Sequence, residues 1–344
     1  MDEPLPNRRR RFVGAIGALV VGAGSTSARA AGRTGLVSGE SLARYGFSDG
    51  HPLGMDRQGA FLQEARRRGL LDRVIAIAPS AAASREVLTR FHTDDHVDLV
   101  ARAEATGLRW LDDGDTPVFP GIYQASAIVV GSAVAALDRV MRGECLRTLQ
   151  PVGGLHHASR SRAAGFCVFN DVGVVIESLR AVYGVRRVAY IDIDVHHGDG
   201  VFYAFEEDPD LIFADIHEDG RHRYPGTGHA HEVGRGAAAG TKINLPLPRG
   251  AGDDAFLAAW SQAEAHLERH APEFIVFQCG ADGLAGDPLA DLALSPQAHR
   301  HVATRLRALA DRHAGGRLMA FGGGGYDRNN LAAAWCEVLA ALSD

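Results

Sequence analysis

Residues 190–200 read Tyr-Ile-Asp-Ile-Asp-Val-His-His-Gly-Asp-Gly and place three aspartates and two histidines in and behind an apolar run. The apolar residues that precede and interleave the polar ones predict a buried strand over 185–195. Side chains repeat every two residues along a strand, so Asp192, Asp194 and His196 would share one face. Charges buried this close together need a cation or hydrogen-bond partners. Aspartate with histidine suits zinc or a similar divalent metal, whereas the structural alternative is a solvated glycine-rich turn.

The rest of the chain has an ordinary globular composition. Of its 344 residues, 46% are hydrophobic and 23% are charged, with a formal net charge of -6. A nucleic-acid-binding protein would carry a basic face, and no basic block occurs beyond the N-terminus, so we expect no nucleic-acid partner. Every basic residue except Lys242 is arginine, a skew that we attribute to composition rather than to function. The scattered cysteines form no Cys-x-x-Cys pair and are expected to be buried free thiols.

Residues 1–31 differ from the rest. A basic block at 8–11 precedes Phe12 and an apolar run at 13–24, and a small-x-small site follows at 28–30. This layout is typical of a secretory signal, and Arg-Arg-x-Phe resembles a twin-arginine leader. The apolar run is too short to span a bilayer, so no stable membrane span is predicted. Two interpretations remain, namely a signal for export to the periplasm, or a nonfunctional extension on a cytoplasmic enzyme.

Residues 35–344 predict a single α/β domain, without internal repeats or low-complexity linkers. Helical periodicity alternates with short β-rich runs, which predicts a central, mostly parallel sheet with helices on both faces. Strands are expected at 185–195, 210–216, 241–246, 274–278 and 317–321. Helices are expected at 57–69, within 79–91, and at 124–142, 172–183, 255–270, 296–314 and 331–342.

Polar residues gather at the ends of the predicted strands and in one glycine-flanked loop. In chain order they are His156, His157, Asp194, His196, Asp282 and Tyr326. Ligand sites of parallel sheets lie at the carboxyl ends of the strands, so we expect these segments to converge on one rim. Each motif alone is a weak signal. The glycines at 322–325 match no phosphate-binding motif, and the specific information lies in the joint occurrence of the motifs in one order.

In that order the motifs resemble the zinc-dependent histone deacetylase superfamily, and most closely its bacterial acetoin-utilisation type, which is similar to class I enzymes. The resemblance covers roughly residues 36–342 and implies the α/β fold shared by arginases and deacetylases. The matching segments are 45–47, 51–52, 91–95, 153–158, 165–171, 192–200, 224–228, 280–282 and 322–326.

The resemblance implies a metal-dependent amide hydrolase that removes acetyl groups from lysine side chains. Asp194, His196 and Asp282 would hold Zn²⁺, and because this ligand set also accepts ferrous iron, Fe²⁺ is an alternative. A structural K⁺ is implied beside Asp192, Asp194 and His196. Class I relatives carry Ser in the neighbouring strand where this chain carries Asp215. The extra carboxylate would strengthen or alter the binding of that cation.

The resemblance also implies the catalytic roles. His157 would be the general base that takes a proton from the attacking water and passes a proton to the leaving amine, with His156 assisting. Asp192 and Asp199 match the family's carboxylates behind His156 and His157, where they would fix the tautomer and raise basicity. Tyr326 would donate its hydroxyl to the developing oxyanion.

A further set matches the family's substrate tunnel. The predicted substrate-binding residues are Asp115, Gly165, Phe166, Tyr224, Leu289 and Gly324. Phe166 and Tyr224 would be aromatic walls around the lysine stem, and Asp115 would hold the substrate backbone at the rim. Leu289 stands where acetylpolyamine-specific relatives carry Glu, which argues against a polycation. Structural alternatives are plain core aromatics for Phe166 and Tyr224, and a turn for Asp115.

Two other functions fit the sequence less well. A binuclear manganese ureohydrolase shares the architecture, but Gly198 and Leu284 stand where it needs two further carboxylates. A non-catalytic binding protein would be expected to have lost a ligand, a histidine or the tyrosine, and the sequence keeps them all. The substrate stays open between an acetylated protein, a small acetylated amine such as an acetylpolyamine, and a longer acyl chain. No pattern specifies the oligomeric state.

Overall fold

The structure is a computed structural model that describes residues 1–2, 34–47 and 50–344. Nearly all of the predicted leader, residues 3–31, lies outside the described residues. The centre is an eight-stranded sheet in the order β2-β1-β3-β8-β7-β4-β5-β6, and every pairing in it is parallel, which confirms the predicted sheet. The strands are β1 (Thr34–Val37), β2 (Ile75–Ile77), β3 (Arg147–Gln150), β4 (Val188–Asp192), β5 (Leu211–Glu218), β6 (Lys242–Leu247), β7 (Phe274–Gln278) and β8 (Leu318–Phe321).

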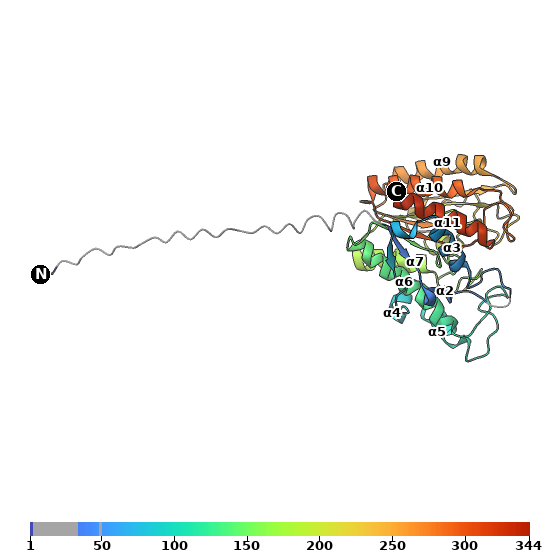
Figure 1. The fold of residues 1–344 in the computed structure, drawn as a ribbon, viewed down its shortest axis with the longest axis horizontal. Coiled ribbons are helices and arrows are strands. Elements are labelled where there is room, and N and C mark those ends of the chain that lie inside the picture. Colours follow the sequence, from blue (N-terminus) through green and yellow to red (C-terminus); the bar gives the residue numbers. More distant parts are fainter. Residues whose placement is uncertain (3–33, 48–49) are drawn as a thin grey trace.

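Helices cover both faces of the sheet. They are α2 (Glu40–Ala43), α3 (Arg57–Arg67), α4 (Arg85–Leu88), α5 (Asp94–Ala103), α6 (Ile122–Met141), α7 (Asp171–Tyr183), α8 (Asp199–Ala204), α9 (Asp253–His270), α10 (Pro296–His313) and α11 (Arg328–Ser343). One layer contains α3, α9, α10 and α11, and the other contains α6 and α7 with the short α2, α4 and α5 (Figure 1).

Because side chains alternate along a strand, each strand contributes residues to the cores on both faces of the sheet. In β4, Val188 and Tyr190 pack into the core under α6 and α7, whereas Ala189 and Ile191 pack into the core under α9 and α10. All five residues of β4 are buried as a result. A strand covered on both faces reads as a nearly continuous apolar run, which is why the sequence identified β4 and β7.

The sequence patterns missed β1, β2 and β3. These strands are only three or four residues long. In β3 the side chains of Arg147, Thr148 and Gln150 are polar yet buried. The equally short β8 was predicted from its apolar run, so length alone does not explain the omission; in β3 the polar residues remove the apolar signal.

The strand predicted to end at Val195 ends at Asp192. Beyond Asp192, side-chain carboxylates accept hydrogen bonds from the backbone amides. Asp192 Oδ1 accepts from Asp194 N at 3.0 Å, Asp194 Oδ1 from His196 N at 3.1 Å, and Asp282 Oδ1 from Val195 N at 3.0 Å. Such local bonds compete with strand pairing. Asp194 and His196 therefore stand on a bent segment beyond the sheet edge, and not on one strand face with Asp192.

Among the described residues, α6 is the one helix long and apolar enough to cross a membrane by length and composition. Of its most apolar window, 56% is buried inside the structure. Burial of this extent, with contacts to α7 and β3, is the pattern of a core helix.

Candidate active site

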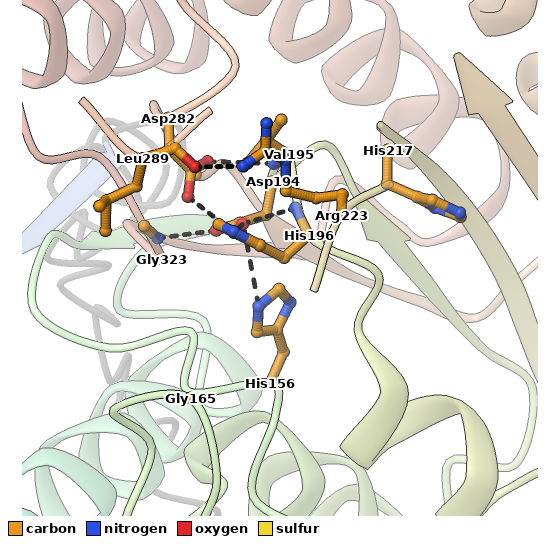
Figure 2. Close-up of polar contacts among 12 residues, drawn as sticks. His156, Gly165, Asp194, Val195, His196, His217, Arg223, Asp282, Leu289 and Gly323 are labelled. Carbon is orange, nitrogen blue, oxygen red and sulfur yellow. Dashed lines mark hydrogen bonds and ion pairs between the residues drawn. The ribbon is translucent and has the colours of Figure 1, made fainter. Parts of the chain in front are cut away.

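Three buried side chains beyond the ends of β4 and β7 form a candidate metal centre. One ligand atom from each of Asp194, His196 and Asp282 lies within 4.8 Å of the other two. His196 Nδ1 lies 3.2 Å from both Asp194 Oδ1 and Asp282 Oδ2. The three side chains turn toward one another, with His156 beside them (Figure 2). The structure thus brings together residues that are 88 positions apart in the sequence.

The electrostatics of this centre favour a cation. Burial disfavours a charge on His196, but Asp194 and Asp282 outweigh it and raise the pKa of His196 to about 10. The two carboxylates therefore stabilise a positive charge between them. Two aspartates and one histidine are also donors that Zn²⁺ and Fe²⁺ accept. The residues present fit a divalent metal.

Neighbouring donors fix the position of Asp194. Gln278 Nε2 donates to Asp194 Oδ2 at 2.8 Å, and Gly324 N donates to the same oxygen at 2.7 Å. A Cβ atom on Gly324 would collide with Asp282 Oδ2, so only glycine lets the backbone approach the ligands this closely. Gln278, the last residue of β7, was not predicted as a site residue, because a glutamine at a strand end carries no chemical signature.

A pair of histidines lies beside the candidate metal centre. His156 Nδ1 lies 2.7 Å from Asp192 Oδ2, His157 Nδ1 lies 2.7 Å from Asp199 Oδ1, and the two Nε2 atoms are 3.1 Å apart. Burial and the neighbouring His156 lower the pKa of His157 to about 4. His157 is therefore neutral at pH 7 and can accept a proton there.

Tyr326 follows the glycine-rich segment after β8. Burial and the nearby carboxylates raise the pKa of Tyr326 well above its usual value, so the hydroxyl keeps its proton and can donate a hydrogen bond. Arg57 is buried and donates from Nε to Gly325 O at 2.9 Å and from Nη2 to Gly323 O at 2.6 Å. The sequence showed Arg57 only as the start of a helix, yet it holds the segment that presents Tyr326.

Leu289 lies on a loop whose backbone is held on both sides. Its N–H donates to Asp287 Oδ1 at 3.0 Å, and its carbonyl accepts from Arg223 Nη1 at 2.7 Å. Asp287 Oδ2 also accepts from Tyr326 N at 2.7 Å, while Arg223 directly precedes Tyr224. Arg223 and Leu289 both lie beside the candidate metal centre (Figure 2). Neither Asp287 nor Arg223 was predicted, although together they connect three predicted site residues.

The predicted aromatic walls lie next to the candidate catalytic groups. The ring of Phe166 is 6.0 Å from that of Tyr326, and the ring of Tyr224 is 5.0 Å from that of His157. A Cβ atom on Gly165 would lie 2.5 Å from His157 Cδ2 and 3.0 Å from Tyr224 Cε1, so glycine is needed between them. Tyr224 is 43% exposed, which makes it a surface wall rather than a core aromatic.

A narrow cavity lies among the histidine pair, two of the clustered metal-ligand candidates and Tyr326. Its volume is about 20 Å³, enough for about one water molecule. Its lining residues are Leu53, Gly154, Leu155, His156, His157, Gly165, Cys167, Asp194, His196, Gly323, Gly324 and Tyr326.

Asp115 is exposed on the loop between α5 and α6. The turn in this loop is made by Asp112, whose Oδ1 accepts from the backbone N of Gly114, Asp115 and Thr116 at 3.1, 2.8 and 2.8 Å. The side chain that forms this turn is therefore that of Asp112, and not that of Asp115, which was the structural alternative for Asp115.

Asp215 lies opposite Asp192 in the neighbouring strand. Its Oδ1 is 2.6 Å from His217 Nδ1, and its Oδ2 accepts from Gly198 N at 2.9 Å. His217 Nε2 faces the carbonyl of Gly228 at 2.9 Å, so both ring nitrogens face acceptors. Burial opposes a charge on His217, but Asp215 raises its pKa above the usual value. The protein thus supplies a counter-charge for Asp215 itself, and the implied K⁺ stays a prediction.

Comparison with known protein families and sequences agrees with this geometry. The Histone deacetylase domain matches residues 51–342. Acetoin utilization protein AcuC of Bacillus subtilis is 37% identical over 300 residues, which cover 85% of this chain and 77% of the relative. Histone deacetylase RPD3 of Saccharomyces cerevisiae is 33% identical over 305 residues, covering 86% and 68%.

Among solved structures, the HDA15 HD domain matches this fold with a TM-score of 0.81 at 25% identity. The match covers 90% of this chain and 88% of the other. The protein is a deacetylase-type hydrolase, and the chain belongs to the histone deacetylase family.

Proposed function

We propose that this hydrolase removes acetyl groups from lysine side chains in a zinc-dependent reaction. One observation carries the proposal. A buried cluster of two aspartates and one histidine, a carboxylate-backed histidine pair and a protonated tyrosine all lie at one narrow cavity. Amide hydrolysis needs an activated water, a polarised carbonyl and a proton for the amine, and this set can supply all three.

Asp194, His196 and Asp282 would hold Zn²⁺, with Fe²⁺ as the alternative, and three protein ligands leave positions open for other ligands. When bound, the metal would polarise the substrate carbonyl and lower the pKa of water. Gln278 and Gly324 would keep Asp194 in place for this role.

The other side chains would move protons. Neutral His157 would take a proton from the attacking water, and Asp199 would stabilise the resulting imidazolium. That proton would then pass to the nitrogen of the leaving amine as the C–N bond breaks. His156, backed by Asp192, would stabilise the charge that moves through the pair. The hydroxyl of Tyr326 would donate to the oxygen on which negative charge develops.

The predicted substrate-binding residues suit an acetylated lysine as substrate. Phe166 and Tyr224 would flank the apolar stem of a lysine. The narrowness of the cavity beside the candidate metal centre favours a short acyl group over a long one. Leu289 offers no charge to a polycation, and Asp115 would accept from a backbone N–H of a peptide at the rim. A small acetylated amine and a longer acyl chain are the alternative substrates.

The test is hydrolysis of a fluorogenic acetyl-lysine peptide by zinc-loaded protein lacking residues 1–31. Turnover should be blocked by a hydroxamate and lost in Tyr326→Phe. It should be kept in Tyr203→Phe, a change at an exposed tyrosine. Metal-loaded protein without turnover would overturn the lysine assignment, and acetylpolyamines and longer acyl-lysines would then be compared.

The cellular location would follow from residues 1–31, which we propose as a twin-arginine export signal. Cell fractionation of the full chain beside an Arg9→Lys, Arg10→Lys variant tests this. Periplasmic protein that is lost in the variant supports export. Cytoplasmic recovery of both proteins would favour the nonfunctional extension.

A further inference from the structure

The hydroxyl group of Tyr224 has no hydrogen-bond partner within the part of the chain that the structure describes. Other tyrosines use their hydroxyls to bind a carbonyl or a carboxylate, namely Tyr45, Tyr183, Tyr190 and Tyr203. An apolar wall needs no hydroxyl, as Phe166 shows at the other predicted wall. The polar atom of Tyr224 is therefore unexplained by packing, and its position decides what it can bind.

The hydroxyl end of the Tyr224 ring lies close to the cavity. An added Cβ atom on Gly165, which lines the cavity, would lie 3.0 Å from Tyr224 Cε1, the ring atom next to the carbon that carries the hydroxyl. The ring meets His157 edge-on, with 5.0 Å between the ring centres. Burial, together with the charge of Asp199 and of further groups that include Asp115, raises the pKa of Tyr224. The hydroxyl therefore keeps its proton and can donate it.

The segment that presents this hydroxyl is held on both sides. Before Tyr224, Arg223 Nη1 donates to Leu289 O at 2.7 Å. After it, His217 Nε2 lies 2.9 Å from Gly228 O. An added Cβ atom on Gly228 would lie 2.5 Å from the same nitrogen, so the backbone rests directly on the buried imidazole. A donor that is fixed in this way binds a ligand without first losing conformational freedom.

The carboxylate of Asp115 is the complementary group. It receives no hydrogen bond from any residue that the structure describes, although the backbone N of Asp115 donates to Asp112 Oδ1 at 2.8 Å. The next residue, Thr116, accepts from Phe166 N at 3.1 Å through Oγ1, which ties this turn to the wall at Phe166. We call the Tyr224 hydroxyl and the Asp115 carboxylate the rim pair, because one is a free donor and the other a free acceptor.

We propose that the rim pair binds the peptide backbone beside the acetylated lysine, with Tyr224 donating to a carbonyl and Asp115 accepting from an N–H. Tyr224 would thus be a specificity-determining residue that favours a lysine within a peptide over a small acetylated amine. A peptide backbone offers both an acceptor and a donor, whereas a simple alkyl acetamide has neither beyond the amide that is cleaved. The inference rests on the proposed function, since it names what the substrate carries beyond its acetylated stem.

The test compares the binding of two hydroxamates to zinc-loaded protein by calorimetry. One is a plain alkyl hydroxamate, and the other carries the same stem as a side chain within a short peptide. Tyr224→Phe should weaken binding of the peptide hydroxamate about 3–10-fold, the effect of one neutral hydrogen bond, and leave the alkyl hydroxamate unchanged.

Tyr183→Phe is the matched control for the loss of a phenolic hydroxyl. Tyr183 is the last residue of α7, and its hydroxyl donates to Asp138. The opposite end of α7 begins at Asp171, whose Oδ2 accepts from the cavity-lining Gly154. We therefore expect Tyr183→Phe to bind both hydroxamates as the unaltered protein does.

Kinetics give a second readout. In Tyr224→Phe, KM for an acetylated peptide should rise by a similar factor while kcat is kept, because the hydroxyl binds the backbone and not the reacting amide. Equal losses for the two hydroxamates, no loss for the peptide hydroxamate, or no preference of the unaltered protein for it would each overturn the proposal. Failure of the proposed function is a separate result, namely no turnover of acetyl-lysine by the unaltered metal-loaded protein, and the binding comparison still decides the role of the rim pair.

Discussion

The hydroxyl of Tyr45 donates to the carbonyl oxygen of Phe166 at 2.6 Å and accepts from Val168 N at 3.1 Å. Phe166 has a φ of 68°, a left-handed conformation that is unfavourable for a residue with a side chain. Its N–H donates to Thr116 Oγ1 at 3.1 Å. A strained wall of the candidate tunnel is therefore held in place by a buried tyrosine on one side and by the Asp115 loop on the other.

Tyr45→Phe should loosen this wall. The change leaves a buried carbonyl and a buried amide without their partner, which we expect to cost about 1–3 kcal/mol in the free energy of unfolding. KM for an acetyl-lysine peptide should rise several-fold, with a smaller change in kcat. Urea unfolding and steady-state kinetics measure the two effects. Tyr123→Phe is the control, because that ring packs against Phe169 in the core. An unchanged KM would show that Phe166 needs no support from Tyr45.

Tyr326→Phe should lower kcat about 10²–10³-fold, the usual effect of removing one oxyanion donor. The metal content should stay the same, because Tyr326 is not among the three clustered ligands. Metal analysis beside kinetics separates the two readouts. A variant with unchanged kcat would exclude Tyr326 as the donor.

Metal removal tests the candidate centre and its support. A chelator should abolish activity, and Zn²⁺ or Fe²⁺ should restore it.

Gln278→Ala removes a donor to Asp194, and we expect metal affinity to fall about 10–100-fold, the usual effect of losing a partner of a ligand. Competition with a chromophoric chelator measures this. Gln58→Ala, at a glutamine that bonds Gly39 instead, should leave the affinity unchanged.

The two residues that hold the Leu289 loop should act differently. Arg223→Met frees the carbonyl of Leu289 and breaks the ion pairs of Arg223 with Glu218 and Asp291, but it leaves the amide of Tyr326 alone. KM should therefore rise several-fold while kcat is largely kept, and Arg223→Lys should restore part of the effect. Asp287→Asn also disturbs the amide of Tyr326, so kcat should fall about tenfold, or about 1.4 kcal/mol. If both variants changed kcat and KM alike, the loop would act as one structural unit.

Acid should destabilise the fold through His92. Its Nε2 accepts from Asn170 N at 2.9 Å, and burial lowers its pKa to about 3. Between the ordinary pKa of 6.5 and about 3, the unfolded chain binds a proton that the folded chain does not. The free energy of unfolding therefore decreases as the pH is lowered, by about 1.4 kcal/mol per pH unit from this group. His92→Gln has a side-chain acceptor that does not titrate. Urea unfolding should show the unaltered protein losing stability relative to this variant below pH 6.5, and a constant difference would contradict the pKa.

The sequence was informative where chemistry resides in side chains. Asp194, His196 and Asp282 were predictable because carboxylates and imidazoles at strand ends are unusual and parallel sheets gather their carboxyl edges. Arg57 and Asp287 could not be found in this way, because their partners are backbone atoms, which every residue possesses. Lys242 is a further case, because its buried ammonium donates to three oxygens, two of them backbone carbonyls that the sequence does not reveal.

The strand order has a consequence for the growing chain. β8 is the last strand in the sequence, yet it lies between β3 and β7 and is the described strand that pairs with both the β2-β1-β3 half and the β7-β4-β5-β6 half. The histidine pair follows β3, whereas Asp194 and His196 follow β4. On the ribosome, the two halves of the sheet cannot be joined until β8 has been made. We therefore expect the candidate site to assemble, and activity to appear, only once almost the whole chain exists.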